Sequence, residues 1–169
     1  MPPRRRYAQD TTVSYHRSRE QIGKLLEDWG AEGIQWTDEW KPSAKFTCKF
    51  LWTFEDDKGN SHPLMAKFVL ACDEEHLQEI SEDLRSGGVS ETKYAKNRKQ
   101  WVNRTHRLLL LLLKAMFNAI DEGLYTPEEL FASFVEHKSG MTVGELFAKQ
   151  IATLSTTAMP KLLAGPDPL

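Results

Sequence analysis

The chain has 169 residues, 40% of them hydrophobic, and a formal net charge of −2. This length suits one domain with a single core, and the charge excludes a molecule attracted to polyanions as a whole, so any such attraction must come from a local patch. Two cysteines, Cys48 and Cys72, exclude a disulfide framework and lack the partners of a zinc site, which predicts small buried groups in a reducing compartment.

Residues 1–12 predict a flexible basic arm, since three arginines stand there without an apolar segment behind them. The longest apolar run of the chain is six leucines, whereas a membrane-spanning helix needs roughly 20 residues. We therefore expect a cytoplasmic protein with no membrane partner. Ser18 and Gln21 form a capping-box pair, and helical spacing of apolar residues up to Trp29 predicts a first helix that stops at Gly30.

Residues 44–55 alternate strictly, which predicts a strand whose apolar side carries Phe46, Cys48, Phe50, Trp52 and Phe54. Turn-forming residues and a second apolar run follow, so that 44–72 predicts an antiparallel hairpin, with a short third strand near 34–36. A purely aromatic face backed by helices is far more often a core than a platform for stacking bases. We expect this face to be core.

Helical elements dominate the rest of the chain. Asp73 can cap an acidic helix with Leu77, Ile80 and Leu84 on one side, ended by "SGG" at 86–88. A long central helix is predicted over 94–122, and capping boxes at Thr126 and Thr142 predict helices over 127–136 and 143–155. The chain is therefore predicted to be α+β, with a small antiparallel sheet packed by about five helices. The single domain is expected over 13–158, and an irregular tail over 159–169.

The long helix contains the stretch "KYAKNRKQWVNRTHRLLLLLLKAMF" at 93–117, in which seven bases and no acid run into six leucines. Two apolar rows are predicted to form its buried face: Trp101, Thr105, Leu108, Leu112, Ala115 and Ala119, and beside them Val102, Leu109, Leu113, Met116 and Ile120. Asn103 falls on the far, basic side, and Leu110 and Leu111 fall near it. Core packing explains the leucines.

The bases leave two interpretations open. They are either the solvated back of a core helix, facing water or the acidic segment 73–84, or a row of phosphate contacts on nucleic acid. The second interpretation makes the chain a non-catalytic protein that associates with nucleic acid, and its candidate residues are Lys93, Lys96, Arg98, Lys99, Arg104, Arg107 and Lys114.

Other classes of function remain open. Trp36 and Trp40 stand in a proline-adjacent segment, and exposed tryptophan is typical of protein interfaces, which predicts a module that binds another protein. An enzyme would need a pocket that gathers His76 or His106 with acids. The histidine spacings match no metal motif and no glycine-rich loop joins a strand to a helix, so we expect no metal, no cofactor and no catalytic residue. Leucines on nearly every side of the long helix would also allow it to pack against a second copy of the chain, so a homo-oligomer is a further possibility of the sequence.

Four segments carry a family resemblance: "VSYHRSREQIGKLLEDWGA", "WVNRTHRLLLLLLKAMFNAIDEGLYTPEELF", "TVGELF" and "MPKLL". In this order and spacing they resemble a family of small phage- and prophage-borne proteins of unassigned biochemical role, over about residues 13–163. The family's second strand follows a short arginine-bearing turn, whereas "EDDKGNSHPLMAKF" is longer and less basic, which weighs against a nucleic-acid role for this hairpin. The resemblance implies an accessory protein of a mobile element in the host cytoplasm, and it implies no catalytic residues. In that setting the protein partner of Trp36 and Trp40 would be a host or phage enzyme.

Overall fold

The computed structural model of the chain describes residues 11–55, 58–79, 81–83 and 88–154. Its centre is an antiparallel three-stranded sheet in the order β1-β2-β3, formed by β1 (Gly33–Glu39), β2 (Lys45–Glu55) and β3 (Ser61–Ala71). Strand β1 is longer than the predicted 34–36, because its residues pair with β2 from Gly33–Leu51 to Glu39–Lys45. The predicted hairpin over 44–72 is confirmed, with β2 as the central strand.

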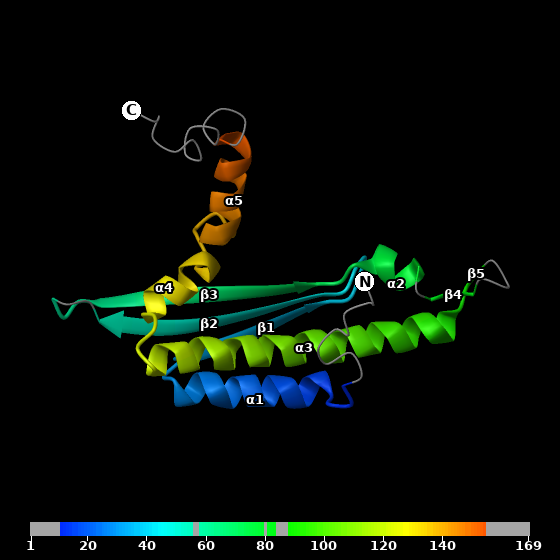
Figure 1. Ribbon diagram of the computed structural model, residues 1–169, viewed down its shortest axis with the longest axis horizontal. Coiled ribbons are helices and arrows are strands. Elements are labelled where there is room, and N and C mark those ends of the chain that lie inside the picture. Colours follow the sequence, from blue (N-terminus) through cyan, green and yellow to red (C-terminus); the bar gives the residue numbers. More distant parts are fainter. Residues whose placement is uncertain (1–10, 56–57, 80, 84–87, 155–169) are drawn as a thin grey trace, which may run out of the picture.

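Two helices cover one face of this sheet (Figure 1). They are α1 (Tyr15–Asp28) and α3 (Glu91–Asp121), and they run parallel, because Tyr15 contacts Asn103 and Trp29 contacts Phe117. The predicted inward side of β2 is confirmed at Phe46, Cys48 and Phe50, which are buried against these helices. The side chain of Phe54 lies outside the described residues.

Helix α1 begins earlier than its capping pair predicts. The cap is Ser14, whose hydroxyl accepts the N–H of Arg17 at 3.3 Å, and Ser18 is a fully buried residue inside the helix. The prediction of a start at Ser18 was wrong because a serine of this small size also fits where two helices pack closely. The stop was placed correctly, since Gly30 has φ +80°, which favours glycine.

The buried face of α3 also differs from the predicted one. The fully or nearly fully buried residues are Val102, Asn103, His106, Leu109, Leu110, Leu113, Met116 and Phe117. Leu108 and Leu112, predicted inside, are 39% and 45% exposed, whereas Leu110 is fully buried in one cluster with residues of α1. The predicted row of Val102, Leu109, Leu113 and Met116 is confirmed as buried. The row of Leu108 and Leu112 was wrong, as was the placement of Asn103 on the far side, because α1 and the sheet together cover an arc of α3 that is rotated toward α1.

The acidic segment is shorter than predicted. Helix α2 (Glu74–Glu79) is capped by Asp73, whose carboxylate accepts the N–H of His76 at 3.0 Å. A two-residue strand pair, β4 (Glu82–Asp83) and β5 (Gly88–Val89), then replaces the predicted continuation to Leu84 and its "SGG" stop. Ser81 follows the helix, and its buried hydroxyl donates to the Leu77 carbonyl at 2.6 Å. Ile80, Leu84 and residues 86–87 lie outside the described residues.

Short elements close the chain. Helix α4 (Pro127–Phe131) and the 3₁₀ turn η1 (Ala132–Phe134) replace the single helix predicted over 127–136. The prediction was too long because Val135 and Glu136 form β-bridges, whereas the capping box at Thr126 is confirmed. Helix α5 (Val143–Leu154) projects away from the sheet (Figure 1). The five α-helices and the antiparallel sheet of the described residues confirm the α+β class. Residues 1–10 of the predicted arm, 155–158 of the predicted domain and the tail 159–169 lie outside them.

Candidate nucleic-acid interface

A pocket of about 560 Å³ opens beyond the end of β1, between the start of α1 and the first turns of α3. Its lining includes the aromatic residues Tyr15, Trp40 and Tyr94 and the cations Arg98 and Lys99. Trp40 is 42% exposed, so part of its indole ring is open to solvent. The pocket thus joins Trp40, predicted for a protein partner, to two bases predicted for nucleic acid.

Arg98 holds Trp40 in place. Its Nη2 donates to the Trp40 carbonyl at 2.6 Å and to the Glu74 carboxylate at 3.3 Å, and its guanidinium carbon lies 5.6 Å from the centre of the indole ring. Phe46 supports the ring edge-on from the core, at 4.9 Å between centroids. Because Arg98 is used in these contacts, we expect it to organise the pocket rather than to contact phosphate.

Glu74 contacts two residues of the pocket lining, Tyr94 and Arg98, and its charge could oppose an anion. Burial would raise the pKa of its carboxyl, but hydrogen bonds from Tyr94 and the Ala44 N–H, together with the charge of Arg98, hold that pKa below its usual value. The hydrogen bond between Tyr94 and Glu74 also raises the pKa of the Tyr94 hydroxyl. The carboxylate is therefore ionised and is already engaged by three groups of the protein.

A second, more polar pocket of about 860 Å³ lies on the neighbouring side of α3, where residues 11–12 and α2 approach the helix. Lys96, Lys99 and Arg104 line it, together with Asp73 and His76 of the α2 region. Gln100 anchors the crossing chain by donating to the Thr11 carbonyl at 3.2 Å. Lys99 belongs to both pockets, so an extended anionic ligand could contact both at once.

Lys96 and Lys99 are exposed and form no hydrogen bond or ion pair with any described residue. The other predicted bases differ. Lys93 lies 3.4 Å from the Glu82 carbonyl, and Arg107 donates to the side chain of Gln21 at 2.8 Å. Lys114 is exposed but lies about 15 Å further along the helix than Arg104. The structure therefore gathers Lys96, Lys99 and Arg104, and leaves Lys114 apart.

Trp36 lies away from the pocket, in a partly buried cluster that sequence reasoning missed. Its ring stacks on Arg19, whose guanidinium carbon is 4.3 Å from the ring centre, and on His106 at 5.5 Å. Arg19 forms a two-pronged ion pair with Asp38 at 2.6 and 3.1 Å and donates from Nε to His106 Nε2 at 3.1 Å. No local sequence pattern predicts this cluster, because Arg19 and His106 are 87 positions apart.

His106 offers no catalytic base. The side chain is fully buried, and its Nδ1 lies 2.8 Å from the Val102 carbonyl, so this nitrogen carries the hydrogen and Nε2 accepts from Arg19. Burial lowers the pKa of His106 to about 4. The hydrogen bond to the Val102 carbonyl acts to raise this pKa, and the charge of Arg19 acts to lower it. Burial likewise raises the pKa of both Cys48 and Cys72 to about 12, so that neither thiol is an activated nucleophile.

In comparisons with known proteins, no family model, no curated protein and no solved structure matches the chain. The resemblance to phage-borne proteins therefore stays a prediction. Within the described residues, no three histidine, cysteine, aspartate or glutamate side chains are grouped so that they could hold a metal ion. No helix of the described part combines the length and the apolar character needed to span a membrane.

Proposed function

We propose that the chain is a non-catalytic protein that binds single-stranded nucleic acid at the start of α3, in the mobile-element setting that the sequence resemblance implies. One observation carries the proposal: the ammonium group of Lys99 borders a pocket lined by Tyr15, Tyr94 and the exposed Trp40, and that of Lys96, one turn before it, lines the adjacent polar pocket. Neither ammonium group has a partner among the described residues. Single-strand binding sites combine these two features, lysines for the phosphates and aromatic rings for the bases.

The aromatic pocket favours a single strand over a duplex. A base can stack on an aromatic ring only when it has left its own stack, and each such contact is worth roughly 1–3 kcal/mol. Lys99 at the rim and Lys96 one turn before it would contact successive phosphates. Since these are only two or three phosphate contacts on a chain of net charge −2, we expect weak binding that fades with salt.

Fluorescence anisotropy with labelled single-stranded and double-stranded oligonucleotides tests this proposal. We expect binding of single strands at low salt, with a slope of log K against log [salt] of about −1.4 to −2. The double variant Lys96→Glu with Lys99→Glu should weaken binding at least about tenfold. The matched control is Lys24→Glu with Lys138→Glu, two exposed lysines elsewhere with the same change in charge.

Trp40→Ala separates stacking from charge. It should weaken single-strand binding while the salt slope stays unchanged, because no phosphate contact is removed. The proposal fails when no oligonucleotide binds at low salt. It fails equally when the control lysine pair weakens binding as much as Lys96 and Lys99 do, because the effect would then be one of net charge.

A further inference from the structure

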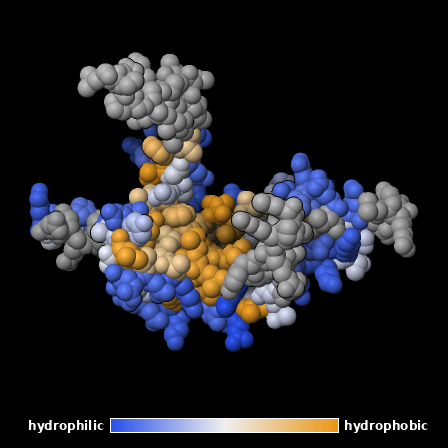
Figure 2. Space-filling model, viewed as in Figure 1, coloured by the Kyte–Doolittle hydropathy of each residue, from blue (hydrophilic) through white to orange (hydrophobic). Residues whose placement is uncertain are grey.

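An apolar groove of about 610 Å³ runs between β3 and α3, next to the polar pocket, whose lining includes Ala71 and Arg104. One wall is the edge of β3 from Lys67 to Leu70, and the other is formed by Leu108, Leu109 and Leu112 of α3. Figure 2 shows hydrophobic surface gathered at the centre of this face of the molecule. Val69, Leu108 and Leu112 are 37%, 39% and 45% exposed, so apolar side chains of both walls are open to solvent.

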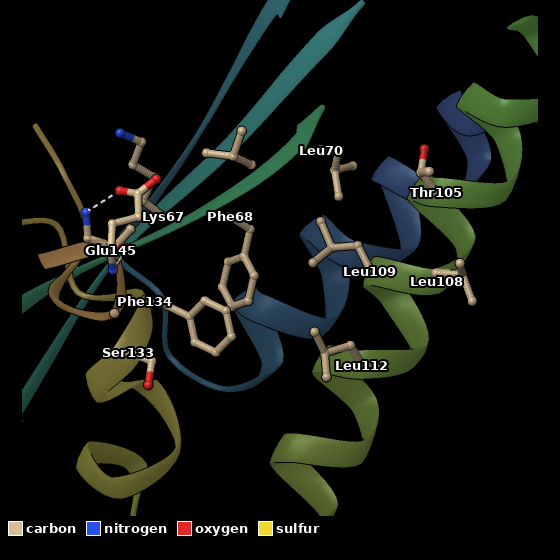
Figure 3. A pocket seen from close by; sticks show the side chains of 13 residues that line it. Lys67, Phe68, Leu70, Thr105, Leu108, Leu109, Leu112, Ser133, Phe134 and Glu145 are labelled. Carbon is tan, nitrogen blue, oxygen red and sulfur yellow. Dashed lines mark hydrogen bonds between the residues drawn. The ribbon is translucent and has the colours of Figure 1, made fainter. Parts of the chain in front are cut away.

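One end of the groove is closed. Phe134 of η1 stacks on Phe68 at 4.3 Å between centroids, and the first turn of α5 lies beside them at Gly144 and Glu145 (Figure 3). From this closed end the groove extends along β3 past Val69 and Leu70. Its occupant must therefore be long and narrow.

The edge of β3 has main-chain groups to offer such an occupant. The Cys72 N–H bonds to the Ala44 carbonyl, so by alternation Phe68 and Leu70 point their main-chain groups at β2, and Val69 and Ala71 point theirs outward. Neither Val69 nor Ala71 has a main-chain partner among the described residues on this outer side. An unpaired strand edge of this kind is a template for another strand.

The chain itself already uses the neighbouring part of this edge. Val135 forms a single antiparallel bridge with Ala66, and the Glu136 N–H donates to the Met65 carbonyl at 2.8 Å. The edge therefore accepts strand pairing up to residue 66, and beyond that point nothing described continues it. No charged side chain interrupts the stretch from Phe68 to Ala71, although charges are the usual means of blocking such an edge.

We propose that this groove binds an extended, apolar peptide segment of a partner protein, which pairs with β3 at Val69–Ala71 as a fourth strand. Alternate side chains of the peptide pack on Leu108 and Leu112, while its main chain satisfies the open groups of β3. A helical segment fits less well, because its main-chain groups are bonded internally and would leave Val69 and Ala71 unpaired. Four or five residues reach about 14–17 Å, which is enough to pass both leucines.

Synthetic peptides with valine, isoleucine, leucine or phenylalanine at alternate positions and threonine between them, flanked by lysines for solubility, serve as probes. In a ¹⁵N-labelled protein we expect peptide-dependent shifts of the Val69 and Ala71 amide signals. N-methylation of the peptide amides on one edge should weaken binding at least about tenfold, because methylated amides cannot donate to β3. The control is the same peptide N-methylated on its opposite edge, which should bind as the unmodified peptide does.

Two protein variants complete the test. Leu112→Lys should weaken binding about tenfold or more, whereas Leu124→Lys, a 69% exposed leucine outside the groove lining, should leave it unchanged. Val69→Pro removes one outward N–H without removing a bond to β2, and should also weaken binding. Lys96→Glu with Lys99→Glu should have no effect, so this inference and the proposed function can fail separately.

The inference is overturned when no peptide of the panel shifts Val69 or Ala71 at concentrations on the order of 1 mM. Equal affinity of both N-methylated forms also overturns it, because it would mean that the peptide binds without strand pairing.

Discussion

Arg19 joins three elements through one guanidinium group. It extends from α1, pairs with Asp38 on β1 and donates to His106 on α3, with the rings of Tyr15 and Trp36 within 5.1 Å and 4.3 Å of its carbon. A largely buried cation is costly unless its donors are satisfied, and here the carboxylate and the imidazole satisfy them. This arrangement requires His106 to be neutral, because a protonated ring would face Arg19 with a hydrogen and a positive charge.

The free energy of unfolding should therefore fall in mild acid. The pKa of His106 is lowered to about 4 from a usual value of 6.5, so between these values the unfolded chain binds more protons than the folded one. The contribution of the neutral His106 to the free energy of unfolding is fully present above pH 6.5. It is lost progressively as the pH falls to about 4, by up to about 3 kcal/mol. Urea unfolding at several pH values measures this loss.

His106→Asn is the matched variant for that measurement. The asparagine amide can still donate to the Val102 carbonyl, but it does not titrate, so the difference between the two proteins should change across pH 4–6.5 and stay constant above it. Three carboxyl groups also have lowered pKa values, those of Glu74, Glu136 and Glu145. Their contributions to the free energy of unfolding are lost below pH 4.5 in both proteins, so they cancel when the two proteins are compared. A difference that does not change with pH would contradict the neutral buried imidazole.

Helix α3 shows at the scale of an element why a run of leucines does not define a face. Six consecutive leucines occupy every direction around the helix, so which of them is buried depends on what packs nearby. With α1 on one flank and the sheet beneath, Leu109, Leu110 and Leu113 are buried, whereas Leu108 and Leu112 face the groove.

Truncation of single leucines distinguishes these positions. Leu110→Ala should lower the free energy of unfolding by about 2–5 kcal/mol, because it opens a cavity among fully buried residues such as Ile22 and Leu26 of α1. Leu112→Ala, the same substitution on an exposed position, should cost less than about 1 kcal/mol. Equal losses in urea unfolding would show that the helix is rotated relative to the arrangement described here.

The elements were easier to predict than their packing. Alternation in β2, the glycine stop of α1 and the box at Thr126 depend on residues close in the chain, and local rules located them. The rotation of α3 and the cluster around Arg19 depend on contacts between residues more than 80 positions apart, which no local pattern encodes. For the candidate site, sequence named Trp40 and Lys99 separately, but only the fold places them around one pocket.

At the scale of the whole molecule, the segment from α4 to Glu136 is anchored to the sheet and the core, whereas α5 packs mainly on η1. Phe131 is buried among the aromatic core residues, and Glu136 accepts hydrogen bonds at 2.7 Å from Lys49, which lies directly opposite Lys67 across the β2–β3 pair. Because one carboxylate lies between two lysines, it relieves their repulsion. Beyond this point α5 projects outward, with Phe147 61% exposed.

Amide hydrogen exchange should reflect this difference in attachment. We expect the amides of α5 to exchange much faster than those of the middle of α3, because local opening of α5 exposes little buried surface. Glu136→Gln should speed exchange over 135–142 and leave α3 unchanged, since the substitution weakens the attachment to the sheet. Mass-spectrometric exchange on the wild-type and variant proteins measures both, and equal protection of α5 and α3 would contradict this expectation.

The parallel alignment of α1 and α3 has a consequence for folding kinetics. Strands β1 to β3 pair with their neighbours in the chain, whereas the bonds between the two helices, such as Arg107 to Gln21, join residues 86–88 positions apart. Closing so long a loop costs more chain entropy than closing a hairpin, so we expect the helix pair to dock after the transition state. Arg107→Ala should then accelerate unfolding in stopped-flow experiments and leave the refolding rate nearly unchanged.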